Sequence, residues 1–176
     1  MNRHAPSLLR HLRSILAGPV TVTLVIPALI LTLSGGHRLA ITGPLAWAAA
    51  VLGLLLALAG LALLIWTIVL FDRVGHGTLS PLNPTQALVL VGPYRHVRNP
   101  MFTGVLAILG GESLITASPL LLAWFVLFWT ALAIAIPRVE EPRLAARFGP
   151  DYTRYRQHVP RWIPRARPWT APRPER

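Results

Sequence analysis

The sequence predicts an all-α, polytopic membrane protein with about four transmembrane helices and further helices along the cytoplasmic interface. Three observations lead to this fold class. Hydrophobic residues make up 53% of the 176 residues and charged residues only 13%, against about 25% in a typical soluble domain. The hydrophobic residues lie in three long blocks. All 17 basic residues are arginines, and they lie between and beyond these blocks.

The three apolar blocks have room for four membrane-spanning helices. Residues 15–33 and 39–71 carry no charged side chain, and residues 101–136 carry only Glu112. Crossing a bilayer takes about 20 residues of helix, so each of the first two blocks predicts one span. The third predicts a tight helical hairpin, because the Ala-Ser-Pro sequence at residues 117–119 offers a turn. The expected spans are residues 16–34, 45–70, 101–117 and 119–136.

Prolines and glycines inside the spans carry their own expectations. Pro19 and Pro27 interrupt the first span, which is tolerated in membranes when neighbouring helices satisfy the freed carbonyl groups. In the third span, Gly104, Gly110 and Gly111 allow a neighbouring helix to approach closely.

The arginine distribution predicts the orientation of the chain. Sixteen of the 17 arginines lie before residue 16, within residues 72–100 or after Pro137, and only Arg38 lies on the opposite side. Positively charged loops stay in the cytoplasm. Both termini are therefore expected there, in a multi-pass protein of a bacterial inner membrane. A cleaved signal peptide over residues 1–34 is the alternative, but the apolar run is too long and no clear Ala-x-Ala site follows.

Composition also limits the domains and partners. One domain is expected over residues 1–164, followed by a disordered Arg/Pro-rich tail over residues 165–176. The net charge of +11 suggests nucleic acid, but the arginines lie where topology alone would place them, so membrane lipid is expected instead. The chain has no cysteine and no His-x-x-x-His or His-Glu-x-x-His spacing. Neither a thiol nucleophile nor a metal site is predicted.

The segment between the second and third spans carries more sequence detail than a connecting loop needs. Glycines and prolines divide residues 75–100 into turns. Residues 87–91 form an apolar run too short to span, so we expect them against the membrane face or in a pocket wall. Arg98, Asn99 and Pro100 lie where the third helix begins. The free N–H groups of a helix N-terminus attract anions, such as a cofactor carboxylate.

A second detailed stretch, residues 138–160, follows the fourth span. Leu144 and Phe148 form an i,i+4 apolar pair, and Gly149 suits a helix C-cap. These features predict amphipathic helices that lie along the interface.

Two adjacent acids, Glu140 and Glu141, lie among arginines where the fourth span ends. They either form salt bridges to Arg138 or Arg143, or they reserve a carboxylate for a cationic ligand. The residues alone leave both interpretations open.

Together the two stretches resemble the motifs of the isoprenylcysteine carboxyl methyltransferases and the related phospholipid methyltransferases of membranes. Residues 88–104 read L-V-L-V-G-P-Y-R-H-V-R-N-P-M-F-T-G, similar to the family's L-V-x-x-G-x-Y-x-x-x-R-H-P-x-Y-x-G. Residues 140–155 read E-E-P-R-L-A-A-R-F-G-P-D-Y-T-R-Y, similar to its E-E-x-x-L-x-x-x-F-G-x-x-Y-x-x-Y. The resemblance covers residues 75–164. It departs from the family pattern at Asn99, where the family has His, and at Phe102, where it has Tyr.

This resemblance implies an S-adenosylmethionine-dependent methyltransferase with a cofactor pocket that faces the cytosol. Its lipophilic or lipidated acceptor would arrive from the bilayer. By motif position the cofactor would be held by Gln86, Ala87, Leu88, Val89, Tyr94, Asn99, Pro100, Met101 and Phe102. Glu141, with Glu140 as the near alternative, would hold a cofactor cation. Arg138 would handle an acceptor carboxylate, and Arg98 would take part in catalysis.

The chemistry of methyl transfer fits these residues. Transfer from a sulfonium depends mainly on positioning and electrostatics, and a carboxylate acceptor is already ionised at neutral pH. Carboxyl O-methylation of an isoprenylcysteine-like substrate is therefore favoured. A phospholipid or amine N-methyltransferase would need a base, for which Glu140, Glu141, His76 and His96 are candidates. Two different interpretations are a non-catalytic membrane protein with a decayed cofactor pocket and a sterol-reductase-like enzyme that binds a nicotinamide cofactor.

Overall fold

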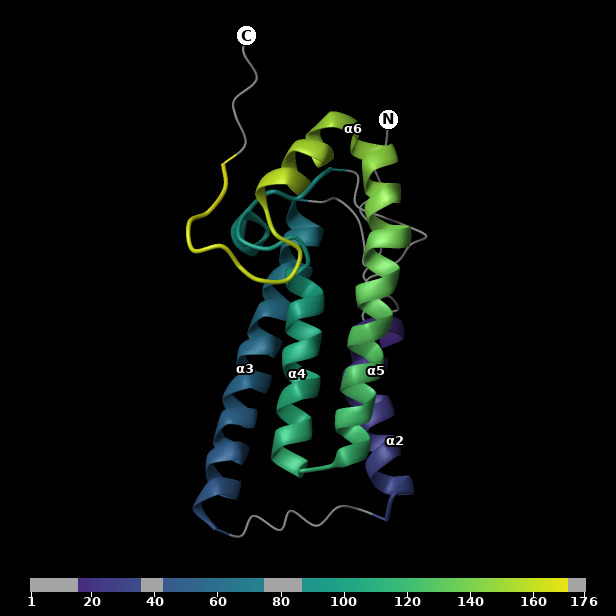
Figure 1. Cartoon of the computed structure of the whole chain (residues 1–176), viewed down its shortest axis with the longest axis vertical. Coiled ribbons are helices and arrows are strands. Elements are labelled where there is room, and N and C mark those ends of the chain that lie inside the picture. Colours follow the sequence, from purple (N-terminus) through teal and green to yellow (C-terminus); the bar gives the residue numbers. More distant parts are fainter. Residues whose placement is uncertain (1–15, 36–42, 75–86, 171–176) are drawn as a thin grey trace.

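Helices are the regular secondary structure of the computed structural model, which describes residues 16–35, 43–74 and 87–170. The all-α prediction is confirmed for these residues. The elements are η1 (Leu16–Val25, a π-helix), α2 (Ile26–Leu33), α3 (Pro44–Arg73), η2 (Gly92–Arg95), α4 (Pro100–Thr116), α5 (Pro119–Ala135), η3 (Ile136–Glu140, a π-helix) and α6 (Glu141–His158). The bundle contains α2, α3, α4 and α5, and α6 lies across one end (Figure 1).

A helix lies at each of the four predicted spans, but their lengths differ. Two continuous helical stretches, Pro44–Phe71 and Pro119–His158, are long and apolar enough to cross a membrane, and the apolar part of the second ends at Ile136. Gly18–Leu33 and Pro100–Thr116 are apolar but shorter. The helical positions therefore agree with the sequence, whereas four complete crossings stay a prediction.

Glycines let α3 and α4 pack with their backbones in contact. A Cβ added to Gly60 would lie 2.6 Å from the carbonyl oxygen of Gly104, and one added to Gly53 would lie 2.7 Å from that of Gly111. The two glycines of each helix lie about two turns apart, so the contact repeats along one stripe of each helix. The predicted close approach is confirmed at Gly104 and Gly111, whereas Gly110 meets only side chains, at 3.5 Å or more.

The bundle is apolar inside and outside. Leu64, Val105 and Leu109 are buried where the helices meet. Side chains on the outer faces are also apolar, and examples such as Leu55 and Leu127 are more than half exposed. Water is a poor solvent for such a surface, and lipid is a good one.

The prolines of η1 and α2 leave helix carbonyl groups without a backbone donor, and a side chain of a neighbouring helix donates to one of these carbonyls. Pro27 has no N–H to give to the helix, and in π-helical register the carbonyl it leaves open is that of Val22. Trp124 of α5 donates its indole N–H to this oxygen at 3.2 Å. Thr23 bonds back to the carbonyl of Pro19. The neighbouring helix thus satisfies a freed carbonyl, as the sequence led us to expect.

The turn between α4 and α5 is the one predicted at residues 117–119. Ala117 ends α4 in the left-handed conformation, with φ 48°. The Ser118 hydroxyl then accepts a hydrogen bond from the N–H of Leu121, which caps α5. A sharp reversal follows, and α5 returns beside α4 (Figure 1).

The last helix continues past the apolar block and bends over the end of the bundle. It passes through η3 and reaches Gly149, whose φ of 55° breaks the regular helix before Pro150 begins the next part. Gly149 thus ends a helical segment as predicted. This bent path carries the adjacent acids and the tyrosines of α6 to one place.

Candidate functional site

A cavity of about 500 Å³ lies at the end of the bundle where α5 continues into α6. Its walls come from the end of α3, from the segment after residue 87 and from the last long helix. Apolar and aromatic side chains form most of the surface. The lining residues are Phe71, Leu88, Val89, Tyr94, Arg98, Asn99, Met101, Phe102, Leu132, Ala135, Ile136, Val139, Glu140, Arg143, Leu144, Arg147, Phe148, Tyr152 and Tyr155.

Two tyrosines fix the segment before α4 against the helices. The hydroxyl of Tyr155 donates a hydrogen bond of 2.7 Å to the carbonyl of Tyr94. The ring of Tyr94 stacks on Phe71, with ring centroids 5.7 Å apart. Burial raises the pKa of both tyrosines well above the ordinary value. Both phenols therefore stay neutral and serve as wall and hydrogen-bond donor.

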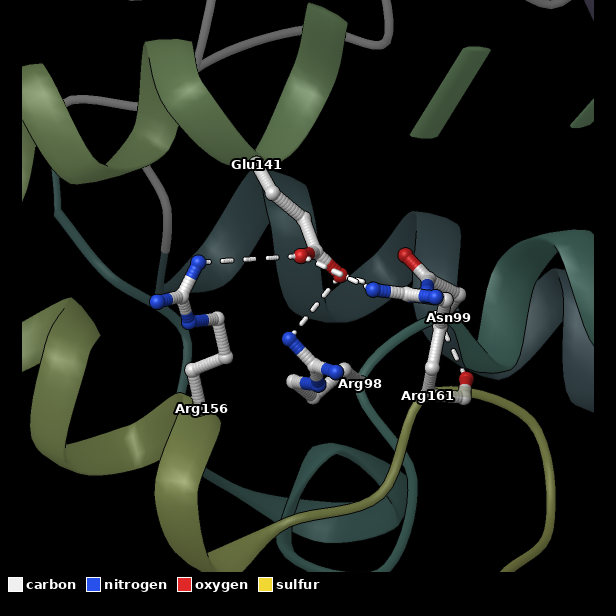
Figure 2. A network of polar contacts seen from close by, with 5 residues as sticks. All are labelled: Arg98, Asn99, Glu141, Arg156 and Arg161. Atoms are coloured by element: carbon white, nitrogen blue, oxygen red, sulfur yellow. Dashed lines mark hydrogen bonds and ion pairs between the residues drawn. The ribbon is translucent and has the colours of Figure 1, made fainter. Parts of the chain in front are cut away.

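Glu141 is buried and surrounded by arginines (Figure 2). Arg161 donates from Nε to Oε1 at 2.7 Å and from Nη2 to Oε2 at 3.0 Å, a two-pronged contact. Arg98 brings Nη1 within 2.9 Å of Oε1. Arg156, which is about half exposed, lies 3.9 Å from Oε2. This carboxylate is fully engaged by the protein and does not line the cavity.

Arg98 has donor groups that the described part of the protein leaves unused. Its side chain is only 10% exposed, and it lines the cavity. Although Nη1 is paired with Glu141 by distance, the contact is not aligned as a hydrogen bond, and Nε has no acceptor among the described residues. A buried donor without an acceptor costs about 1–3 kcal/mol. The site is therefore suited to an anionic group that would complete the guanidinium.

Glu140 is the carboxylate that faces the cavity. It lines the pocket, and no described side chain forms a hydrogen bond or ion pair with it. Burial raises its pKa, and the charge of Glu141 raises it further. A cation placed beside Glu140 would oppose both effects and lower this pKa.

The structure brings together most of the residues predicted for the site. Eight line the cavity: Leu88, Val89, Tyr94, Arg98, Asn99, Met101, Phe102 and Glu140. Ala87, Pro100, Arg138 and Glu141 lie outside the lining, and Gln86 falls outside the described residues. Arg138 is exposed. The salt bridges of Glu141 go to Arg98, Arg156 and Arg161, and not to its sequence neighbours Arg138 and Arg143.

Sequence reasoning missed two groups of residues. The first is the α6 face formed by Arg143, Leu144, Arg147 and Phe148, which lines the cavity. Its i,i+4 spacing was a usable signal, since one face of a helix meets one environment. The second is Arg161, whose position in an Arg/Pro-rich stretch gave no indication of a buried partner 20 residues earlier.

The C-terminal segment His158–Thr170 is held in place by specific contacts. Arg98 donates its backbone N–H to the carbonyl of Pro160, and Arg165 donates its own to that of His96. Trp169 is buried against Tyr155 and His158, and exchanges hydrogen bonds with Arg95. One buried tryptophan and several main-chain bonds thus place residues 165–170 against residues 95–98 and α6, whereas the division into a domain over residues 1–164 and a disordered tail stays a prediction. Residues 171–176 lie outside the described part.

Fold and site together define a helical, membrane-associated protein with a ligand pocket at one end of its bundle. The sequence pattern of the phospholipid methyltransferase family matches residues 48–151, more than half of the chain, and the protein belongs to this family. The match confirms the resemblance drawn from the two motifs and identifies a membrane methyltransferase. It covers most of α3, all of α4 and α5 and the first part of α6, and ends before Arg161. Comparisons with curated proteins and with solved structures found no match.

Proposed function

We propose that this protein is an S-adenosylmethionine-dependent methyltransferase that acts on a lipophilic acceptor. The observation that carries the proposal is the presence, in one apolar cavity, of two buried groups with unused capacity. Nε of Arg98 has no acceptor among the described residues, although the same guanidinium is ion-paired with Glu141, and no described side chain forms a hydrogen bond or ion pair with Glu140. These two groups are complementary to a ligand that carries a carboxylate and a cation on an otherwise uncharged body.

The residues present fit this cofactor. A volume of about 500 Å³ lies within the range of about 300–1,000 Å³ for small-molecule sites. The guanidinium of Arg98, at the start of α4, suits a carboxylate, and the helix N-terminus adds to the positive potential there. Glu140 suits the ammonium or sulfonium. Phe71, Tyr94 and Phe102 offer apolar and aromatic surface for the adenosine part.

The protein's contribution to the reaction is binding, orientation and exclusion of water. When bound, S-adenosylmethionine supplies an activated methyl group on a positively charged sulfur. Arg98 would hold its carboxylate and Glu140 its ammonium or sulfonium, and the apolar walls would keep these charges poorly solvated, which strengthens their effect. Because burial and the charge of Glu141 raise the pKa of Glu140, a cation beside it would stabilise its ionised form, and the pocket would favour a positively charged ligand over a neutral one.

The acceptor is proposed to be a carboxylate on a lipophilic molecule. Arg143 and Arg147 lie one turn apart on α6, line the cavity and reach solvent, so they can meet an acceptor's anionic group at the pocket mouth. A carboxylate acceptor needs no base. The second candidate is N-methylation of a phospholipid amine, which is favoured by the family match and by the raised pKa of Glu140, since such a carboxylate is a better proton acceptor than an ordinary one.

We also propose that the pocket end of the bundle faces the cytoplasm in a multi-pass membrane topology. The arginines at this end, on α6 and the segments beside it, support this orientation through the positive-inside rule. The exposed apolar faces of α3 and α5 support contact with lipid.

One experiment tests the proposed function and separates the two acceptors. Detergent-purified protein is incubated with methyl-labelled S-adenosylmethionine and a lipid and prenyl-peptide extract. Label that is released as volatile methanol by mild base identifies a carboxyl methyl ester, whereas base-stable label in a phospholipid headgroup identifies N-methylation. If calorimetry detects no binding of S-adenosylmethionine or S-adenosylhomocysteine at high concentration, the proposal is wrong.

A further inference from the structure

Arg161 lies outside the cavity lining, yet it makes the best-aligned contacts of the buried Glu141 (Figure 2). We propose that Arg161 is a positioning residue for Arg98. By occupying both oxygens of Glu141, it prevents Arg98 from closing on that carboxylate and keeps the Arg98 donors directed at the cavity. This inference rests on the proposed function, because the ligand group that Arg98 would receive is the cofactor carboxylate.

The geometry around Glu141 is asymmetric. Arg161 forms two aligned hydrogen bonds, one to each oxygen. Arg98 brings Nη1 within 2.9 Å of Oε1 without hydrogen-bond alignment, and its Nε has no acceptor among the described residues. A guanidinium and a carboxylate prefer a two-pronged contact. With Arg161 gone, Oε2 would be open to Arg98 on one side, and the two groups could form that preferred contact away from the ligand.

Main-chain hydrogen bonds hold the segment that carries Arg161, independently of its side chain. The backbone N–H of Arg98 bonds to the carbonyl of Pro160 at 2.9 Å, immediately before Arg161. The Asn99 side chain donates to the carbonyl of Arg161 itself. Val159, two residues before Arg161, is almost fully buried. Replacing the guanidinium therefore changes the electrostatics at Glu141 and leaves the path of the chain in place.

The net charge around Glu141 depends on Arg161. Arg98 and Glu141 alone would form a neutral pair with little attraction for an anion. With the partly exposed Arg161 added, the group of three carries a net positive charge, and the excess is available to a ligand carboxylate. Arg156 adds little, because it is about half exposed and 3.9 Å from the carboxylate.

The test compares two ligands that differ only in their amino-acid part. S-adenosylhomocysteine has the carboxylate, and 5′-methylthioadenosine lacks the whole amino-acid group. We expect Arg161→Gln to weaken binding of S-adenosylhomocysteine by about tenfold, as for one hydrogen bond to a charged group, and to leave methylthioadenosine within about twofold. In an Arg98→Gln background the same Arg161 substitution should have no further effect on S-adenosylhomocysteine. Isothermal titration of the full-length protein in detergent measures the wild type, the two single variants and the double variant.

Two further variants keep the test decisive. Arg156→Gln is the matched control and should bind both ligands as the wild type does. Arg161→Lys restores the charge but not the two-pronged contact, so it should recover part of the lost affinity, and it replaces Arg161→Gln if that variant does not fold. Equal weakening of both ligands, or additive losses with Arg98→Gln, would overturn the inference and leave the proposed function intact. Failure of the wild type to bind either ligand would overturn both.

Discussion

The two ends of this protein are stabilised by different means. In the bundle, α3 and α4 meet through glycines and apolar side chains, and shape complementarity holds them. At the pocket end, one buried carboxylate, Arg98, Arg161 and the C-terminal segment hold α6 to the start of α4. A contact made by shape fails when an atom is added, whereas a contact made by charge fails when a charge is removed. Substitutions of these two kinds should therefore separate the two regions.

The largest loss of stability is expected from Glu141→Gln at the pocket end. This change removes the carboxylate that Arg98 and Arg161 share and leaves buried positive charge uncompensated, at a cost of about 3 kcal/mol. Thermal unfolding in detergent, followed by circular dichroism, measures the loss. Asp151→Asn is the matched control, because Asp151 is an exposed acid on the same helix, and it should leave the melting temperature unchanged. If both variants lowered the melting temperature by the same small amount, the Glu141 carboxylate would not be what stabilises the pocket end.

The next largest effect is expected in the bundle, from Gly60→Ala. The new Cβ would lie 2.6 Å from the carbonyl oxygen of Gly104, so α3 and α4 must separate, at a cost of about 1–3 kcal/mol. The same unfolding measurement applies. Gly110→Ala adds the same methyl group in α4 where the nearest atom is 3.5 Å away, and it should be neutral or slightly stabilising. Equal destabilisation by both would show that helix separation is not the cause.

A smaller and local effect is expected from Trp169→Ala. The side chain anchors the C-terminal segment on Tyr155 and His158, and its loss should open that segment without unfolding the bundle. Hydrogen exchange should therefore speed up by about tenfold or more at the backbone amides of Arg98 and Arg165, whereas amides in the α3–α4 contact keep their protection. Ile163→Ala, at an 80% exposed position, is the control. Faster exchange throughout α3 and α4 would refute a local role.

The bundle was predictable from the sequence because its signals are local. Apolar runs set the helices, the Ala-Ser-Pro sequence set the α4–α5 turn, and the glycines of α4 indicated a close helix contact before its partner was known. The partners Gly53 and Gly60 were not identified, because pairing depends on how α3 and α4 are placed along each other. The lengths of the helices also left the number of complete membrane crossings open.

The pocket end was predictable only where motif residues pointed to it. Glu140 and Arg98 were found through their motifs, but composition gave no indication of the contacts that residues 165–170 make. Arg161, the hydrogen-bond partner of Glu141, was also missed, because composition does not indicate long-range contacts. Arg161 is one of ten arginines after Pro137, and nothing within its own neighbourhood distinguishes it from those that remain exposed. Its role arises only when the chain folds back on residues 95–99, a long-range contact that spacing does not encode.

The smallest expected effect concerns the pH dependence conferred by Glu140. Its pKa is raised in the folded protein, first by burial and then by Glu141. The folded state therefore holds this proton more tightly than the unfolded state, so the associated stability is present at low pH and is lost as the pH rises through the raised pKa. Glu140→Gln mimics the protonated form. It should remove this decline and leave the variant slightly more stable than the wild type at neutral pH, as thermal unfolding across a pH series would measure.

Ligand binding should lower the pKa of Glu140, which folding raises. A bound cation favours the ionised carboxylate, so S-adenosylhomocysteine, through its ammonium, should displace a proton from Glu140 at pH values between its ordinary and raised pKa. Titration calorimetry in buffers of different ionisation enthalpy counts the protons released. The wild type should release up to one proton per ligand, affinity should rise with pH through this range, and Glu140→Gln should release none. Equal release by the two proteins would mean that Glu140 does not contact the cation, and that the pocket distinguishes charged ligands through Arg98 alone.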